Sequence, residues 1–248
     1  MGSPLTADDV PPVPPPWIAT RDTGSATTFH ARPIPDPADH LVWILDVDQP
    51  AVVLGSSQRP DAVDPVAASA AGIEVVTRRS GGGAVALEPG VDCWIDVIVP
   101  AGSPVWHNDV GRAFDWLGAV WTRTINDLLA ARSLPMLAAP HTGAFQPGEL
   151  GRLVCFASLG PGEVVVEGAK VVGISQRRTR SAARFQSNVV WRWRPELLQH
   201  VLATDAETRA AIDRVAAGGL PAPAPTPAEI AARFCANLPT IADDHDHS

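Results

Sequence analysis

A run of two arginines and three glycines is the first feature of this sequence that points to chemistry. The run is Arg78-Arg79-Ser80-Gly81-Gly82-Gly83. Glycine allows positive φ and a close approach of a ligand, successive backbone N–H groups can surround an anion, and arginine adds a planar fork of donors. Neither a helix nor a Lys-Ser/Thr pair follows, so this is not a Walker or dinucleotide-binding loop. The run predicts an anion-binding loop, and a hairpin turn with two solvated arginines stays open as the alternative.

Lys170, the only lysine of the chain, is the second candidate. Two valine runs, 164–166 and 171–172, flank the sequence Glu167-Gly168-Ala169-Lys170, which predicts a β-hairpin with a glycine-containing turn. An ammonium fixed in a water-poor site stabilises negative charge on a bound or reacting group. A solvated hairpin lysine is the alternative interpretation.

Cys155 is the third candidate, as a nucleophile. A thiolate near cationic groups is a competent nucleophile, and Arg152 and Lys170 are the candidate neighbours. A buried, inert cysteine is the alternative. The three cysteines stand at irregular spacing without a CxxC pair, so we expect neither a disulfide framework nor a zinc site. This usage indicates a reducing, cytoplasmic compartment.

Composition narrows the class of protein. The chain has 248 residues, of which 46% are hydrophobic and 19% charged, which is typical of a globular protein with a sizeable core. The formal charge of −8 argues against nucleic-acid binding, which needs a basic surface. No apolar run is long enough to span a membrane, and the first residues do not resemble a secretory signal.

Apolar patterns then indicate the elements that must position these residues. Compact apolar runs predict strands at 41–45, 51–54, 73–76, 93–99 and 188–193. Apolar side chains recur every three or four positions over 108–131, which predicts the longest helix, with Asn108 as its N-cap. The fold class is therefore α/β (α+β), with a mixed, mainly antiparallel sheet flanked by helices.

The ends of the chain differ in composition from its centre. Residues 1–16 are polar and then proline-rich, so we expect a flexible lead-in. A single domain is expected over 17–240, because no internal linker divides it, and a disordered tail over 241–248.

Three segments together resemble the lipoate–protein ligase A family of the biotin/lipoate ligase superfamily. Residues 78–85 resemble its Arg-Arg-x-Gly-Gly-Gly-x-Val signature. The paired strands that end in Gly55-Ser56-Ser57-Gln58 are similar to its Gly-x-x-Gln segment, and residues 168–177 to its Gly-x-Lys-Ile-x-Gly-Ser-Ala-x-Arg segment. Biotin ligases share the fold but carry Gly-Arg-Gly-Arg at the loop, which is absent here.

The resemblance implies a chemistry in which ATP and lipoate or octanoate form an acyl-adenylate, and the acyl group then passes to a lysine of a carrier domain. It implies that residues Arg78 to Gly83 wrap the acyl-adenylate, that Gly55 and Gln58 line the acyl pocket, and that Lys170 holds the carboxyl end. Gly173 and Ser175, in the third segment, would also contact the ligand. Glu163 would help to hold Mg²⁺, with an ordinary surface glutamate as the alternative.

The resemblance also implies partners. The acceptor would be a lipoyl carrier domain, either of a 2-oxoacid dehydrogenase acyltransferase subunit or of a glycine-cleavage H-type protein. A separate accessory subunit would replace the C-terminal domain of larger ligases, for which this chain has no room. Neither nucleic acid nor a membrane is expected as a partner.

Two departures from the family pattern keep other functions open. Leu87 occupies the position of a family histidine, and Val91-Asp92 replaces the asparagine that follows. The first alternative is an ATP-independent octanoyltransferase with Cys155 as the nucleophile, because Cys155-Phe156 followed by Lys170 resembles the cysteine-dependent transferases. The transferases, however, tend to have Thr-Gly-Gly-Arg at the loop. The second alternative is a non-catalytic protein that binds lipoate or an adenylate.

Overall fold

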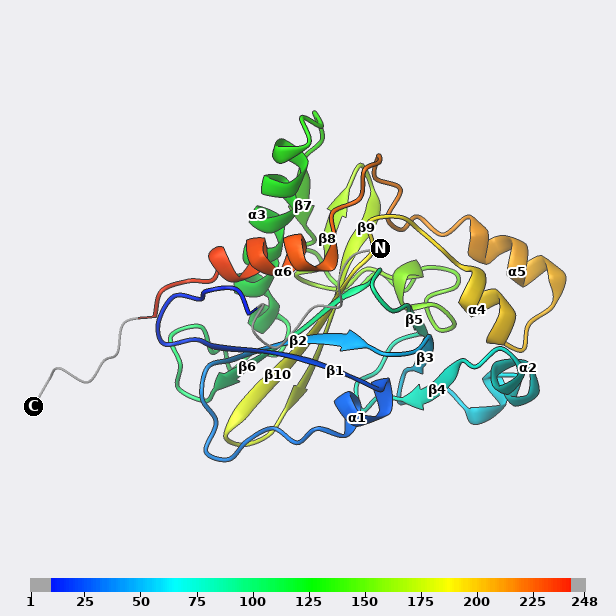
Figure 1. The fold of residues 1–248 in the computed structure, drawn as a ribbon, viewed down its shortest axis with the longest axis horizontal. Helices are drawn as coiled ribbons and strands as arrows, with labels where there is room; N and C mark the ends of the chain where they lie inside the picture. Colours follow the sequence, from blue (N-terminus) through cyan, green and yellow to red (C-terminus); the bar gives the residue numbers. More distant parts are fainter. Residues whose placement is uncertain (1–9, 242–248) are drawn as a thin grey trace, which may run out of the picture.

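Seven strands form the main sheet of the computed structural model, which describes residues 10–241 (Figure 1). Their spatial order is β1 (Ile18–Gly24), β2 (Leu41–Val47), β6 (Cys93–Pro100), β10 (Ala182–Val189), β9 (Ala169–Arg178), β8 (Val164–Val166) and β7 (Ala138–Pro140). β1 and β2 run parallel, and the other neighbouring pairs are antiparallel. The mixed, mainly antiparallel sheet predicted from the sequence is confirmed.

A smaller sheet packs against one face of the main sheet. It holds β4 (Glu74–Thr77), β3 (Ala51–Leu54) and β5 (Val85–Leu87), with β3 parallel to β4 and antiparallel to β5. The interface between the two sheets buries Trp43, Leu45, Val53 and Trp94 together with α1 (Ala26–Ala31). The small sheet is therefore one wall of the space between two layers.

Two helices cover the opposite face of the main sheet. They are α3 (Asp115–Ala131) and α6 (Pro227–Ala236), and their residues Trp121 and Phe234 are fully buried with ring centroids 4.3 Å apart. Successive side chains of a strand point to opposite faces of the sheet. One set of apolar side chains therefore packs against these helices, and the other set packs against the small sheet.

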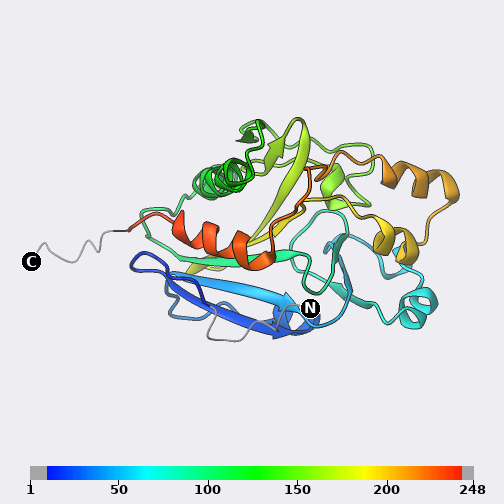
Figure 2. The same cartoon turned by 45° about the horizontal axis from the view of Figure 1, so that its top comes forward.

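A third cluster of helices packs on the outer face of the small sheet. It contains α2 (Pro65–Ala70), α4 (Glu196–Val201) and α5 (Ala206–Asp213), whose apolar side chains meet Val52 and Leu54 of β3. Figure 2 shows these helices grouped at one end of the molecule, away from α3 and α6. Since β3 is covered on both faces, all four of its side chains are buried.

The structure corrects two predicted boundaries. The helix expected from residue 108 begins at Asp115, after a short 3₁₀ turn (Arg112–Phe114). The Asp109 carboxylate accepts from the N–H groups of Gly111 and Arg112 and holds a turn there, while Asn108 accepts from the Trp106 indole instead of capping the helix. The strand expected at 188–193 overlaps β10 (Ala182–Val189) only at residues 188–189, so most of β10 was not predicted and residues 190–193 lie outside the sheet.

The ends of the described chain pack on the core. Val13 contacts the main core cluster, and Ile241 is buried in it. The rest of the expected lead-in, residues 1–9, and of the expected tail, residues 242–248, lies outside the described residues. Among residues 10–241, no helix is both long and apolar enough to cross a membrane.

Candidate active site

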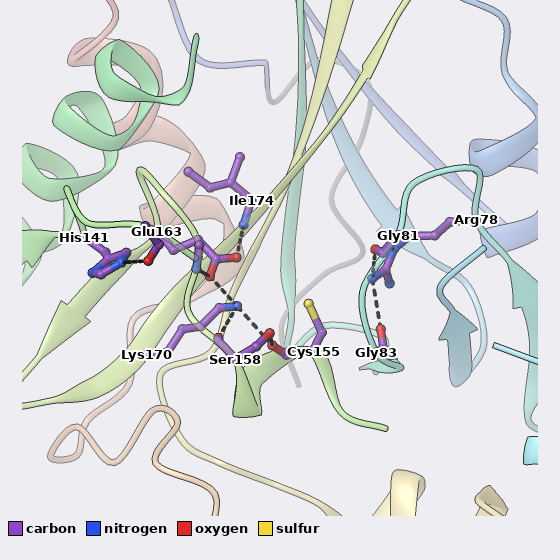
Figure 3. Close-up of polar contacts among 11 residues, drawn as sticks. Arg78, Gly81, Gly83, His141, Cys155, Ser158, Glu163, Lys170 and Ile174 are labelled. Carbon is purple, nitrogen blue, oxygen red and sulfur yellow. Dashed lines mark hydrogen bonds and ion pairs between the residues drawn. The ribbon is translucent and has the colours of Figure 1, made fainter. Parts of the chain in front are cut away.

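The glycine loop connects β4 to β5, and Arg78 holds it from inside. The Arg78 side chain is buried, and its Nη2 donates to the carbonyls of Gly81 at 2.8 Å and Gly83 at 2.9 Å (Figure 3). With these carbonyls drawn inward, the N–H groups of Gly81, Gly82 and Gly83 donate to no acceptor within residues 10–241. Such a run of unpaired N–H groups is the backbone arrangement that binds anions.

Two arginines near this loop are free of partners in the described part of the chain. Arg79 is exposed and Arg177 is half-buried, and the side chain of neither forms a hydrogen bond or an ion pair with residues 10–241. Burial, and then the nearby charges of Arg79 and Arg184, lower the pKa of Arg177. Arg177 was not assigned to the site from the sequence, although it ends the third family segment.

Close backbone contacts bring the separate segments together. A Cβ atom on Gly55 would lie 1.8 Å from the carbonyl oxygen of Gly82, and one on Gly83 would lie 2.6 Å from the backbone of Val154. The Ser80 hydroxyl donates to the Ser175 hydroxyl on β9 at 3.1 Å. The glycine loop, the end of β3 and β9 are therefore neighbours.

Gln58 closes the turn that follows β3. Its side-chain oxygen accepts from the N–H of Gly55 at 2.9 Å, and its side-chain nitrogen donates to the carbonyl of Leu153 at 3.1 Å. Gly55 and Gln58 are not among the residues that line the nearby cavity. In this arrangement both residues shape the backbone beside the cavity.

An apolar cavity lies between the two sheets. Its apolar lining comes from β3, β5, β6, β9 and the 3₁₀ turn at 155–157, and includes Val53, Val85, Leu87, Trp94, Phe156 and Ile174. Leu87, at the family histidine position, thus contributes an apolar wall. Gly173 and Ser175 line the same cavity, as do Arg78 and Cys155. The cavity is suited to an apolar chain that ends near the glycine loop.

His30 is a lining residue that sequence reasoning missed. It lies in the last turn of α1, and its ring is 4.7 Å from that of Trp94. Arg184, paired with Asp96, donates to the carbonyls of Phe29 and Arg32 and so holds the end of this helix. Burial, followed by the charges of Arg184 and Arg78, lowers the pKa of His30 to about 3. The imidazole is therefore neutral at physiological pH.

Lys170 lies next to this cavity, and its ammonium group is held by polar contacts within the protein. Its Nζ is 3.1 Å from the carbonyl oxygens of both Cys155 and Ser158 and 2.7 Å from Oε2 of Glu163 (Figure 3). The nitrogen also lies 4.9 Å from the centre of the Phe156 ring. Lys170 is only 3% exposed, so the interpretation as a solvated hairpin lysine is wrong. The predicted hairpin is present, with β8 and β9 joined at Glu167-Gly168.

Glu163 is buried, so the interpretation as a surface glutamate is wrong. Its two oxygens accept from the N–H groups of Gly160 at 2.7 Å and Ile174 at 3.1 Å, in addition to the Lys170 contact. Within residues 10–241, no group of three or more His, Cys, Asp or Glu side chains could hold a metal ion. The carboxylate expected to hold Mg²⁺ is thus committed to Lys170.

Cys155 opens the 3₁₀ turn and is half-buried. Its N–H donates to the carbonyl of Ala84 at 3.0 Å, which ties the turn to the end of the glycine loop. The thiol lines the apolar cavity, and Figure 3 shows its sulfur between the Lys170 group and the Arg78 loop. Arg152, expected as a cationic neighbour, is exposed and has no hydrogen bond or ion pair within the described part of the chain.

Comparison with known proteins decides the family. The family model of the lipoyl protein ligase A/B catalytic domain matches residues 27–217, which is more than half of the chain. The chain belongs to this family. The segment matched contains the glycine loop, Cys155, Glu163 and Lys170, so the resemblance drawn from the three segments is confirmed. No curated protein matches the chain.

Solved structures agree on the fold. A bi-partite lipoate protein ligase from Thermoplasma acidophilum matches with 16% identity and a TM-score of 0.63, over 89% of this chain and 80% of that one. A putative lipoate protein ligase from T. acidophilum with bound lipoic acid has 16% identity and a TM-score of 0.61, over 88% and 80%. A lipoate-protein ligase A bound with ATP has 15% identity and a TM-score of 0.60, over 89% and 82%.

Alanine substitutions at Gly55 and Gly81 should differ in their effect on the stability of the fold, because only Gly55 lies against another backbone segment. Gly55→Ala places a methyl group against a backbone oxygen 1.8 Å away, and should lower the free energy of unfolding by about 1–3 kcal/mol. Gly81→Ala, whose added methyl meets open space without a positive φ, should be neutral or stabilising by up to about 1 kcal/mol. Urea unfolding measures both, and equal effects would contradict the close approach.

The lowered pKa of His30 predicts an effect of pH on stability. Below about pH 6.5, an unfolded histidine takes up a proton, whereas the folded His30 stays neutral down to about pH 3. Protonation then favours the unfolded state, so stability should fall as the pH drops from 7 to 5. In His30→Gln the fall in the urea midpoint should be smaller. An unchanged fall in that variant would refute the burial of a neutral imidazole.

Proposed function

We propose that this protein activates lipoate or octanoate with ATP and transfers the acyl group from an acyl-adenylate to a lysine of a lipoyl carrier domain. One observation carries the proposal: the unpaired N–H groups of the glycine loop lie beside the apolar cavity, whose lining includes Cys155 and Phe156. An acyl-adenylate has the same two parts, an apolar chain and an anionic phosphate. Structures with the same fold hold lipoic acid in one case and ATP in another.

Each part of the site has a role in this reaction. The N–H groups of residues 81–83, with Arg79 and Arg177, bind the phosphate, because they are the donors without partners nearby. Arg78 keeps the loop in shape from inside. Leu87 and Trp94 contact the acyl chain. Lys170 stabilises the charge on the reacting carboxyl group after it leaves its resting contacts.

The acceptor in this proposal is a lipoyl carrier domain of a 2-oxoacid dehydrogenase or of the glycine-cleavage system. One protein of the same fold was solved as part of a system with its E2 lipoyl domain. That similar ligase is bi-partite, and we include a separate accessory subunit in the proposal for the same reason. Glu163 pairs with Lys170 in the structure, so the proposal assigns this carboxylate to Lys170 and not to Mg²⁺.

The position of Cys155 favours octanoyl transfer as a second candidate function. Its thiol lines the apolar cavity next to Gly82. As a thiolate it would attack the thioester of an octanoyl carrier, form a new C–S bond and release the carrier thiol. A lysine amine of the acceptor would then attack the enzyme thioester, form the amide and release Cys155. This route needs no ATP.

Incubation with an apo lipoyl domain tests both candidates. One reaction contains ATP, Mg²⁺ and free lipoate or octanoate, and the other contains an octanoyl carrier protein without ATP. We expect acylation, measured by the mass of the lipoyl domain, only in the first. Acylation only in the second establishes the transferase instead, and lipoate binding without acylation in either establishes a binding protein.

Two substitutions separate the roles of the candidate residues. Lys170→Ala should lower acylation by at least about 100-fold, the size typical of losing a group that stabilises developing charge. Cys155→Ser should retain the ATP-dependent activity, because the thiol takes no part in adenylation. A Lys170→Ala variant that is folded and fully active would remove Lys170 from the mechanism.

A further inference from the structure

The three hydrogens of the Lys170 ammonium are all used within the protein. An ammonium has three donors and no acceptor, and Lys170 directs them to the carbonyls of Cys155 and Ser158 and to the carboxylate of Glu163. We name these three acceptors the holding site. With every donor satisfied and its charge paired, Lys170 has no free donor for a bound carboxylate or phosphate.

The holding site is rigid on the side of Glu163. This carboxylate accepts from two backbone N–H groups, those of Gly160 and Ile174, and is 5% exposed. Lys170 instead carries its charge on a flexible stem of four carbons. If the pair separates, the lysine is therefore the partner that moves.

Lys170 and two residues of the holding site, Ser158 and Glu163, are not among the residues that line the apolar cavity. Cys155 and Phe156 line that cavity, while Lys170 lines a neighbouring cavity for which Phe156 is again a wall. Gly173 lies between Lys170 and the apolar cavity, and a Cβ atom there would be 3.3 Å from Cε of Lys170. The absence of a side chain at Gly173 leaves room for the lysine stem to turn toward the cavity.

From this geometry we propose that Glu163 is a positioning residue that holds Lys170 away from the apolar cavity and competes with a bound acyl-adenylate for its ammonium. The proposal rests on the function proposed above. A ligand can draw Lys170 out of the holding site only by as much as it binds the released arrangement more tightly. The ion pair therefore lowers the apparent affinity for an anionic ligand.

The proposal predicts in which direction the ligand affinity changes when the Glu163 charge is removed. In Glu163→Gln the buried ammonium has no counter-ion, and the anion of a bound ligand supplies one. The apparent affinity for the ligand should rise about fivefold or more, within the usual range of coupling between two binding equilibria. A glutamate that merely supports the fold, or one that ligates a metal, would give weaker binding when replaced.

The test uses octanoyl-sulfamoyl-adenosine, a non-hydrolysable anionic mimic of the acyl-adenylate, in a buffer with EDTA. Isothermal titration gives its Kd for the full-length protein and for Glu163→Gln. Glu163→Asp, which keeps the charge, should bind like the unsubstituted protein. Glu167→Gln is the matched control, because this exposed glutamate lies in the hairpin turn without a contact to Lys170 and loses the same charge.

The outcomes separate the two proposals. Tighter binding only in Glu163→Gln supports the inference. Equal or weaker binding in that variant, with normal binding by the unsubstituted protein, overturns the inference and leaves the proposed function intact. No binding by the unsubstituted protein overturns both. If Glu163→Gln is too unstable for titration, the rise in Tm caused by the mimic replaces the Kd, and it must exceed the rise in the unsubstituted protein.

Discussion

The site depends on a close approach of three backbone segments around the glycine loop. Gly55 lies against the carbonyl of Gly82, and Gly83 lies against the backbone of Val154, at separations that leave no space for a Cβ atom. Arg78 draws two of the loop carbonyls inward. The position of the unpaired N–H groups, the cavity wall and the turn that carries Cys155 all follow from this contact, since each is attached to one of the segments.

A second constraint is the burial of charge between the layers. Arg184 pairs with Asp96 inside the main sheet and donates to two carbonyls at the end of α1, which places His30 in the cavity. Glu163 pairs with Lys170 in the same way beside the 3₁₀ turn. Buried ions need partners of this kind, because an uncompensated charge in the interior is strongly destabilising. The two buried ion pairs therefore neutralise charge in the interior and also fix the positions of parts of the site.

Local pattern predicted several strands of both sheets and the longest helix, but not β1, β7 or α1. Short apolar runs predicted β2, β3, β4 and β6, and the valine pairs around Gly168 predicted the β8–β9 hairpin, because period and turn chemistry are local properties. The start of α3 was predicted wrongly, since a side-chain turn at Asp109 interrupts an apolar period that continues through it. Most of β10 was also missed, because the predicted strand at 188–193 shares only residues 188–189 with it. Residue order along the chain also identified the family, which the match over residues 27–217 confirms.

The sequence by itself determined which groups are available for chemistry: the glycine loop, the single lysine, Cys155 and Glu163. Only the tertiary structure decided which of them are free to act. Arg78 and Arg79 are adjacent residues of the same type, yet Arg78 is buried under the loop and Arg79 is exposed. Lys170 and Glu163 are seven positions apart on either side of a hairpin, and their pairing depends on how that hairpin packs against the turn at 155–158. Which side chains pair depends on contacts between segments that are distant in sequence, and the spacing of residues along one strand does not predict these contacts.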